Sequence, residues 1–100
     1  MPLLPIEFLP DAIAEAREAH QWYAQRSESA AERFMDELDV AIEAIQRSPE
    51  RMAAYLHGTQ RYLLKRFPYV IVFRVTGELI QVIAVAHGRQ RPGYWQRRAK

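Results

Sequence analysis

Two stripes of apolar residues at helical spacing occupy the first half of the chain. The first follows Pro10 and Asp11, residues that favour the opening turn of a helix, and it contains Ala12, Ala16, Ala19 and Tyr23. The second follows the tetrapeptide SAAE at residues 29–32, which has the spacing of a capping box, and Ser48-Pro49 ends it. Its apolar positions are Phe34, Leu38, Ala41, Ile42 and Ile45. This pattern predicts two antiparallel helices joined by residues 26–28.

The apolar period changes to that of β-strands after residue 59. Residues 60–67, 69–75 and 79–87 alternate with a period of about two and are predicted to be strands. Turns are expected at Pro68 and at residues 76–78. Near the start of the chain, residues 4–9 alternate weakly, and Pro5 suits an edge strand because proline donates no ladder hydrogen bond.

The turn at Gly77-Glu78 fixes how the last two strands pair. A two-residue loop places Arg74 opposite Gln81 and Phe73 opposite Val82, whereas a slip of one residue would turn Arg74 toward the core. One face of this hairpin is then wholly apolar, and we expect the helices to cover it and to leave the other face open. The apolar face comprises Tyr69, Ile71, Phe73, Val75, Ile80, Val82, Ala84 and Ala86.

Together these elements predict an α+β fold in a single domain over residues 1–100. An N-terminal edge strand precedes an antiparallel helical hairpin that packs on a mainly antiparallel sheet, in the order β-α-α-β-β-β. Residues 88–100 form a basic C-terminal tail with a turn at Pro92-Gly93.

Composition excludes several kinds of site. The 100 residues include no cysteine, so disulfides, thiolate metal sites and cysteine nucleophiles are absent. His20, His57 and His87 lack metal-ligand spacing, and the glycines form no phosphate-binding loop. No apolar run reaches the length of a membrane span, and the N-terminus lacks the pattern of a signal peptide. We expect a cytoplasmic protein without cofactor, metal, membrane contact or small-molecule substrate.

Charge divides the chain in two. Residues 1–50 carry 4 Lys and Arg against 11 Asp and Glu, whereas residues 51–100 carry 10 against Glu78 alone. The halves either form two solvated faces that attract one another or present a cationic surface to nucleic acid or an acidic protein. Arginine beside aromatic residues favours partner binding. The candidate binding residues are Arg61, Arg66, Arg74, Arg91, Tyr94 and Trp95.

Three stretches resemble the RelE/ParE superfamily of toxins from bacterial type II toxin–antitoxin modules. They are RYLLKRFPY at residues 61–69, FRV at 73–75 and VAHGR at 85–89. The resemblance implies a small cytosolic toxin neutralised by a cognate antitoxin. It also implies one of two activities, which are poisoning of DNA gyrase and ribosome-dependent cleavage of mRNA.

The same motifs favour the gyrase-directed ParE branch and a protein that is not an enzyme. In the RNA-cleaving branch, Lys65, His87 or Arg89, and Tyr94 would fill catalytic roles. However, Val70 stands where that branch has an arginine, and Leu63 takes one lysine position. The alternatives are an mRNA endonuclease and a non-toxic relative that only binds its partner.

Two expectations follow for partners and for the tail. An acidic antitoxin segment should lie against the basic half of the chain. If gyrase is the target, residues 89–95 are the expected contact. Because the predicted strands end at His87, removal of residues 92–100 is expected to abolish toxicity and to leave the fold intact.

Overall fold

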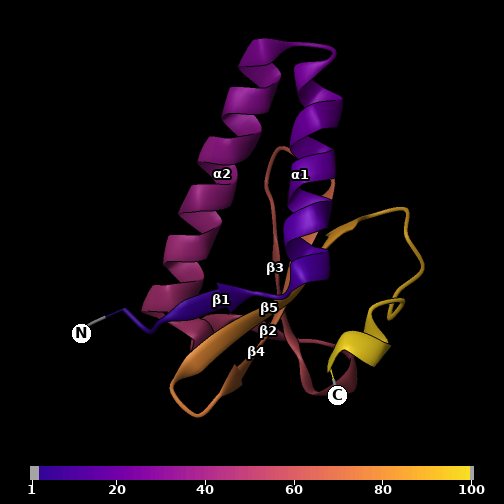
Figure 1. Cartoon of the computed structure of the whole chain (residues 1–100). Helices are drawn as coiled ribbons and strands as arrows, with labels where there is room; N and C mark the ends of the chain where they lie inside the picture. Colours follow the sequence, from indigo (N-terminus) through magenta and orange to yellow (C-terminus); the bar gives the residue numbers. More distant parts are fainter. Residues whose placement is uncertain (1–2, 100) are drawn as a thin grey trace.

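The computed structural model describes residues 3–99 and has two helices that pack on one face of a five-stranded sheet (Figure 1). The helices are α1 (Pro10–Ala24) and α2 (Glu28–Arg47). The sheet has the order β1-β5-β4-β3-β2. Its strands are β1 (Ile6–Phe8), β2 (Ala53–Ala54), β3 (Gln60–Leu63), β4 (Tyr69–Thr76) and β5 (Leu79–His87). This confirms the predicted α+β architecture.

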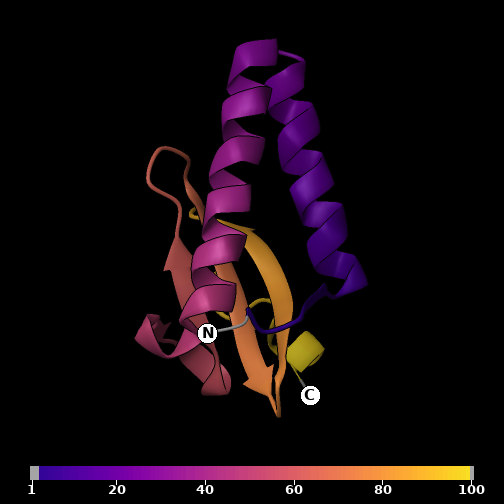
Figure 2. The same cartoon turned by 90° about the vertical axis from the view of Figure 1, so that its left-hand side faces the viewer.

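The helices run antiparallel and extend beyond the end of the sheet, as Figure 2 shows. Helix α1 begins at Pro10, as predicted. Helix α2 begins earlier than predicted, because the N-cap is Ser27, whose Oγ accepts a hydrogen bond from the backbone N–H of Ala30 at 3.2 Å. Ser29 lies inside the helix, so the predicted capping box at residues 29–32 was wrong.

Strand β1 forms one edge of the sheet, as predicted, and it pairs with β5 in parallel. The other pairings are antiparallel. Strand β3 ends at Leu63 rather than Phe67. The two-residue edge strand β2 and the short 3₁₀ turns η1 (Pro49–Arg51) and η2 (Leu56–Gly58) were not predicted.

The register of the β4–β5 hairpin is as predicted near its turn and shifts further along. Arg74 pairs with Gln81 and Phe73 with Val82, but Val72 pairs with Ala84 because a β-bulge intervenes. A bulge inserts one residue and reverses which side chains face each side beyond it. Val85 therefore faces the helices, whereas Ala84 packs on the opposite face. The prediction that Ala84 and Ala86 line the helix-facing side was wrong.

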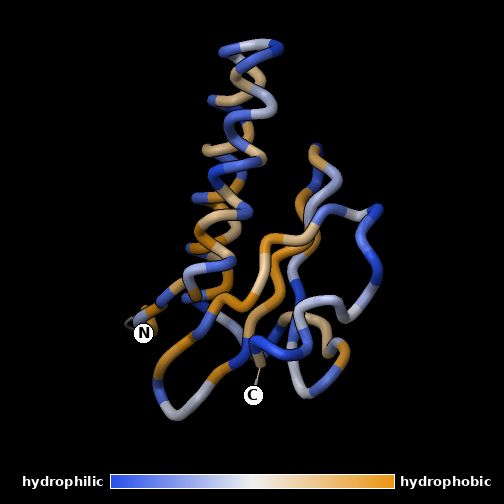
Figure 3. Tube along the Cα trace, turned by 45° about the vertical axis from the view of Figure 1, so that its right-hand side comes forward, coloured by the Kyte–Doolittle hydropathy of each residue, from blue (hydrophilic) through white to orange (hydrophobic). Residues whose placement is uncertain are grey.

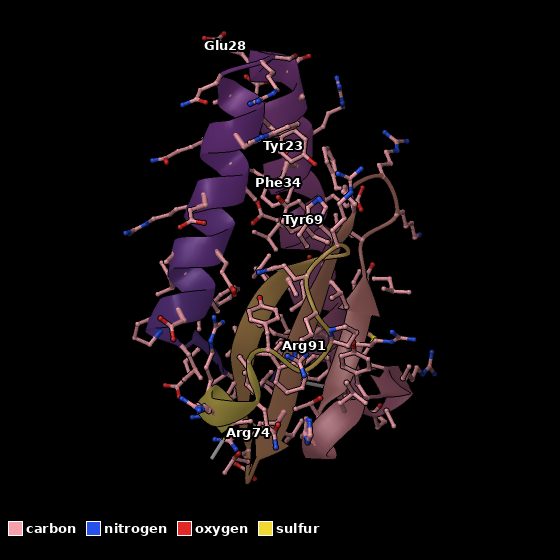
Figure 4. The ribbon with its side chains drawn as sticks, turned by 90° about the vertical axis from the view of Figure 1, so that its right-hand side faces the viewer. Tyr23, Glu28, Phe34, Tyr69, Arg74 and Arg91 are labelled. Atoms are coloured by element: carbon pink, nitrogen blue, oxygen red, sulfur yellow. The ribbon has the colours of Figure 1, made fainter. Side chains whose placement is uncertain are left out.

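The main core lies between the helices and the sheet. Phe34, Ile45, Ile71, Phe73 and Val82 are fully buried in it. At the far end of the helical hairpin, a cluster of rings continues this core, and Figure 4 shows three of them, Tyr23, Phe34 and Tyr69, side by side. The Phe67 ring completes the cluster, with its centroid 4.9 Å from that of Tyr23.

The C-terminal segment covers the other face of the sheet. After β5 it leaves as a loop, which is the polar stretch in Figure 3, and it returns to the strands through the 3₁₀ turn η3 (Gln96–Ala99). Trp95 is 1% exposed and packs against Val72, Ile83 and Ala84. The helix-free face is therefore not open along its whole length, and this part of the prediction was wrong. The pattern of strands could not reveal the cover, because the tail has no regular period.

Candidate partner-binding groove

A groove of about 440 Å³ lies on the helix-free face, between β3 and the C-terminal segment. Its walls combine apolar, aromatic and cationic side chains. Among the described residues that line it, none is acidic. They include Tyr55, Arg61, Leu63, Val70, Gln90, Arg91, Tyr94 and Trp95. This composition suits a partner segment that carries carboxylates and apolar anchors.

Two arginines from opposite walls give the groove its charge. Arg61 on β3 holds its guanidinium carbon 4.7 Å from the centre of the Tyr55 ring. Tyr55 in turn lies 6.0 Å from Trp95, centre to centre. Arg91 is exposed on the tail and lies over the strands in Figure 4. The Tyr55 ring thus helps to hold Arg61 in place, while Arg91 reaches solvent. Leu63, 60% exposed, adds an apolar anchor point.

The tail wall is fixed to α1 through Glu15. Its carboxylate accepts hydrogen bonds from the Tyr94 hydroxyl, from the Arg98 guanidinium at 2.9 Å and from the backbone N–H of Val85 at 3.0 Å. Burial and the hydrogen bond to Glu15 raise the pKa of Tyr94 well above its ordinary value. Tyr94 therefore stays protonated and serves as a donor to Glu15.

His87 lies at the end of the groove where β5 meets the tail, and Arg89 follows it in the tail. The His87 Nδ1 accepts the backbone N–H of Arg89 at 3.0 Å, and the His87 ring lies edge-on to Tyr69 at 5.1 Å. His87 lines both the groove and a second hollow beneath α1, whereas Arg89 lines only the second. These contacts hold the His87 side chain at the turn that ends β5.

Lys65 and Arg66 lie elsewhere. Their backbone N–H groups donate to the carboxylate of Glu37 on α2. Both side chains line a separate hollow of about 320 Å³, together with Arg33. The structure thus gathers His87 and Tyr94 along one groove, but it does not bring Lys65 to them.

Two of the predicted binding residues belong to the tail's own packing. Trp95 is 1% exposed because the indole fills the core beneath the tail, so its side chain offers little surface to a partner. Arg74 donates to Gln81 Oε1 at 2.9 Å and to the carbonyl of Ala99. The guanidinium of Arg74 therefore helps to hold the end of the tail.

Sequence reasoning missed Tyr55, Glu15 and Arg98. Tyr55 lies in a loop without period, and Glu15 is a charged residue outside the apolar stripe of the first helix. For the Glu15–Arg98 pair, the charge split of the sequence was the one available signal. A buried carboxylate from the acidic half requires a cation, and most cations lie in the second half of the chain. In residues 3–99, no group of three or more metal-binding side chains gathers, and no helix is long and apolar enough to span a membrane.

Both the sequence and the fold match known proteins. The sequence model for "ParE toxin of type II toxin-antitoxin system, parDE" matches residues 6–92. The chain is 28% identical over 76 residues to proteins named Toxin ParE2 from two strains of Mycobacterium tuberculosis, covering 75% of this chain and 72% of theirs. A solved structure titled "Chromosomal ParDE TA system from P. aeruginosa" superposes with a TM-score of 0.74 at 18% identity. That match covers 85% of this chain and 96% of the other.

Proposed function

The chain belongs to the ParE toxin family of type II toxin–antitoxin systems, and we propose that it inhibits growth by binding DNA gyrase. A cognate acidic antitoxin neutralises it. Membership of this family implies an antitoxin partner. The gyrase target is the family expectation that the motifs at residues 67–69 and 87–89 support.

The absence of acidic side chains from the described lining of the groove is the observation that carries this proposal. Arg61 and Arg91 supply two cationic anchor points, and Leu63 supplies an exposed apolar one. Arginine and tyrosine at the centre of an interface dominate binding because they bury large areas and still form hydrogen bonds. The groove thus fits a protein segment better than it fits a small molecule.

The separation of Lys65 from His87 argues against an RNA-cleaving centre. Cleavage needs an acid, a base and a charge-stabilising cation around one phosphate. Lys65 lines a different hollow from His87 and Tyr94, and the Tyr94 hydroxyl is already bonded to Glu15. A binding role needs no such convergence of groups.

The direct test adds the purified protein to gyrase with supercoiled plasmid and, separately, to translating ribosomes. We expect gyrase-dependent DNA breaks or loss of supercoiling, and intact mRNA. The double variant Arg61→Gln/Arg91→Gln should need at least about tenfold more protein for the same effect, equivalent to about 1.4 kcal/mol. Arg47→Gln is the matched control, because Arg47 is an exposed arginine of α2 paired with Glu43.

Two other outcomes would replace the proposal. Cleaved mRNA with unaffected gyrase would identify an endonuclease, and His87→Ala should then abolish cleavage but preserve antitoxin binding. Inactivity in both assays, with normal growth when the chain is expressed without antitoxin, would indicate a non-toxic relative that only binds its partner.

A further inference from the structure

The free edge of β5 beyond β1 is closed by side chains rather than by a strand. Strand β1 ends at Phe8, which pairs with Val82, and the next residue donates its N–H to the Val82 carbonyl. Further along this edge, the N–H of Val85 donates to Glu15 and the carbonyl of Ile83 accepts from Arg98 at 3.3 Å. An unpaired strand edge is exposed to wrong pairing. Glu15 and Arg98 together satisfy this one.

Glu15 joins three parts of the chain at a single carboxylate. Its donors come from β5, from Tyr94 in the tail and from Arg98 in η3. The Glu15 and Arg98 side chains are only 16% and 21% exposed. Removal of one partner from such a pair leaves a poorly solvated charge without its counterion, which is costly. Asp11 reaches Arg98 at 3.4 Å, but its side chain is 68% exposed, so it replaces little of this interaction.

The other contacts of the tail with the rest of the chain include the packing of Trp95 and a hydrogen bond from Arg74 at its end. Trp95 packs on the strands, its ring lies 5.9 Å from that of His57, and Arg74 donates to the carbonyl of Ala99. The backbone hydrogen bonds of residues 94, 96 and 98 are all made within the segment itself. Release from the sheet therefore need not break them.

We propose that Glu15 is the positioning residue that holds residues 91–99 across the helix-free face of the sheet. When its contacts are lost, this segment leaves the sheet as a unit while the helices and strands stay folded. The inference rests on the proposed function in one respect, because the same segment forms the tail wall of the groove and carries Arg91 and Tyr94. Glu15 would then control partner binding without touching the partner.

Amide hydrogen exchange in Glu15→Gln tests the release. Glutamine can still accept from Val85 or Tyr94, but its amide N–H₂ meets the donors of Arg98. We expect the opening constant measured at the Val85 amide, which donates to residue 15, to rise at least about tenfold, which is about 1.4 kcal/mol. The amides of Phe73 and Ile71, in the core between helices and sheet, should not change. Glu18→Gln is the matched control, because Glu18 is exposed one turn along α1.

Fluorescence gives an independent measure of the same movement. The chain has two tryptophans, and Trp22 is 49% exposed, so a Trp22→Phe background leaves the buried Trp95 as the reporter. In Glu15→Gln, emission of Trp95 should shift to the red and acrylamide should quench it more strongly. In Glu18→Gln both signals should stay unchanged.

Arg98→Met covers the case in which Glu15→Gln does not fold. Methionine keeps an unbranched apolar stem, and Glu15 keeps its bonds to Val85 and Tyr94, so the same signals should move less. The double variant should exchange only slightly faster than Glu15→Gln alone. Both changes break the Glu15–Arg98 interaction, and Arg98→Met additionally removes only the bond to the Ile83 carbonyl and the exposed pair with Asp11. Unchanged Trp95 emission and exchange in both single variants would overturn the proposal. Equal acceleration of the Val85 amide and the core amides would also overturn it, because Glu15 would then stabilise the whole fold.

Partner binding separates this inference from the proposed function. If the tail is released in Glu15→Gln and gyrase inhibition falls while Glu18→Gln inhibits normally, both stand. Release of the tail in a chain whose unmodified form leaves gyrase untouched would retain the positioning role and reject the gyrase target. If the unmodified chain inhibits gyrase but the tail is not released in the variants, the gyrase target would stand and the positioning role would be rejected.

Discussion

At the scale of single residues, the hydroxyl group of Tyr94 is bonded to a carboxylate instead of facing a ligand. Burial and the hydrogen bond to Glu15 raise its pKa, and the nearby Arg98 lowers it by less. Burial also raises the pKa values of Tyr23 and Tyr69 in the ring cluster. The folded chain thus keeps protons on these tyrosines at a pH where the unfolded chain loses them.

The raised pKa of Tyr94 makes stability depend on alkaline pH. The stabilisation is complete below the ordinary tyrosine pKa of 10.0 and declines as pH rises beyond it, because only the unfolded state then releases the proton. Denaturant unfolding between about pH 9 and about pH 11 should show a falling free energy of unfolding. In Tyr94→Phe, the free energy of unfolding should decline less steeply with pH. The difference in slope should stay below about 1.4 kcal/mol per pH unit, which is the limit for one titrating group. An unchanged slope in this variant would contradict the assignment.

At the scale of elements, the start of α2 depends on one hydroxyl. Ser27 accepts the N–H of Ala30, whereas Ser29 is an exposed helical residue that bonds Ser27 and Arg33. Both serines precede the same apolar stripe, so spacing alone did not distinguish the cap from its neighbour. The choice follows from the backbone, because Ser27 has extended dihedral angles and an N-cap requires them.

Replacement of the two serines measures this cap. Ser27→Ala should lower the free energy of unfolding by about 1 kcal/mol, the typical value of an N-cap side chain. Ser29→Ala should change it by no more than a few tenths. Thermal and urea unfolding of the two variants give the comparison. Equal losses would restore Ser29 as a capping residue.

The apolar pattern predicted the helices, the main strands and the turn register, because each of these buries a regular face. It failed where the period breaks. The bulge near Val72 and Phe73 shifts the register in the middle of an unbroken apolar run, where either face of β5 satisfies burial. The tail has no regular apolar period, so nothing in the sequence indicated that Trp95 is buried. The groove residues Arg61 and Arg91 were identifiable from charge, but Tyr55 became part of the site only through tertiary packing.

Removal of residues 92–100 should destabilise the fold, contrary to the expectation from sequence. The deletion takes Trp95 from a fully buried position and exposes Val72, Ile83 and Ala84. Loss of a buried tryptophan side chain alone costs about 3–5 kcal/mol, against a total of about 5–15 kcal/mol for a typical domain. Urea unfolding followed by circular dichroism should show this loss. Arg97→Ala, at an exposed position of the same segment, should leave stability nearly unchanged.

At the scale of the whole molecule, the charges of the two halves lie on different layers. Most acids are on α1 and α2, whereas Arg61, Arg74 and Arg91 lie on the helix-free side of the sheet, and Glu78 is confined to the β4–β5 turn. Glu15 and Arg98 join the layers at one point, and this pair accounts for only a small part of the imbalance. The remaining cations leave a face that attracts acidic partners over a distance.

This separation of charge predicts the kinetics of antitoxin binding. Long-range attraction raises association rates and is screened within about 8–10 Å at physiological ionic strength. In stopped-flow measurements, the association rate of the antitoxin should therefore fall steadily as salt rises, while the dissociation rate changes little. Arg61→Gln and Arg91→Gln should each lower the rate and weaken its salt dependence, because each removes one cation from the groove. Arg47→Gln removes the same charge from the helical layer and should leave the salt dependence intact.

An association rate that is constant across ionic strength would show that apolar contacts, such as those at Leu63, govern the encounter. Attraction by the cationic face would then have no part in how the toxin is recognised.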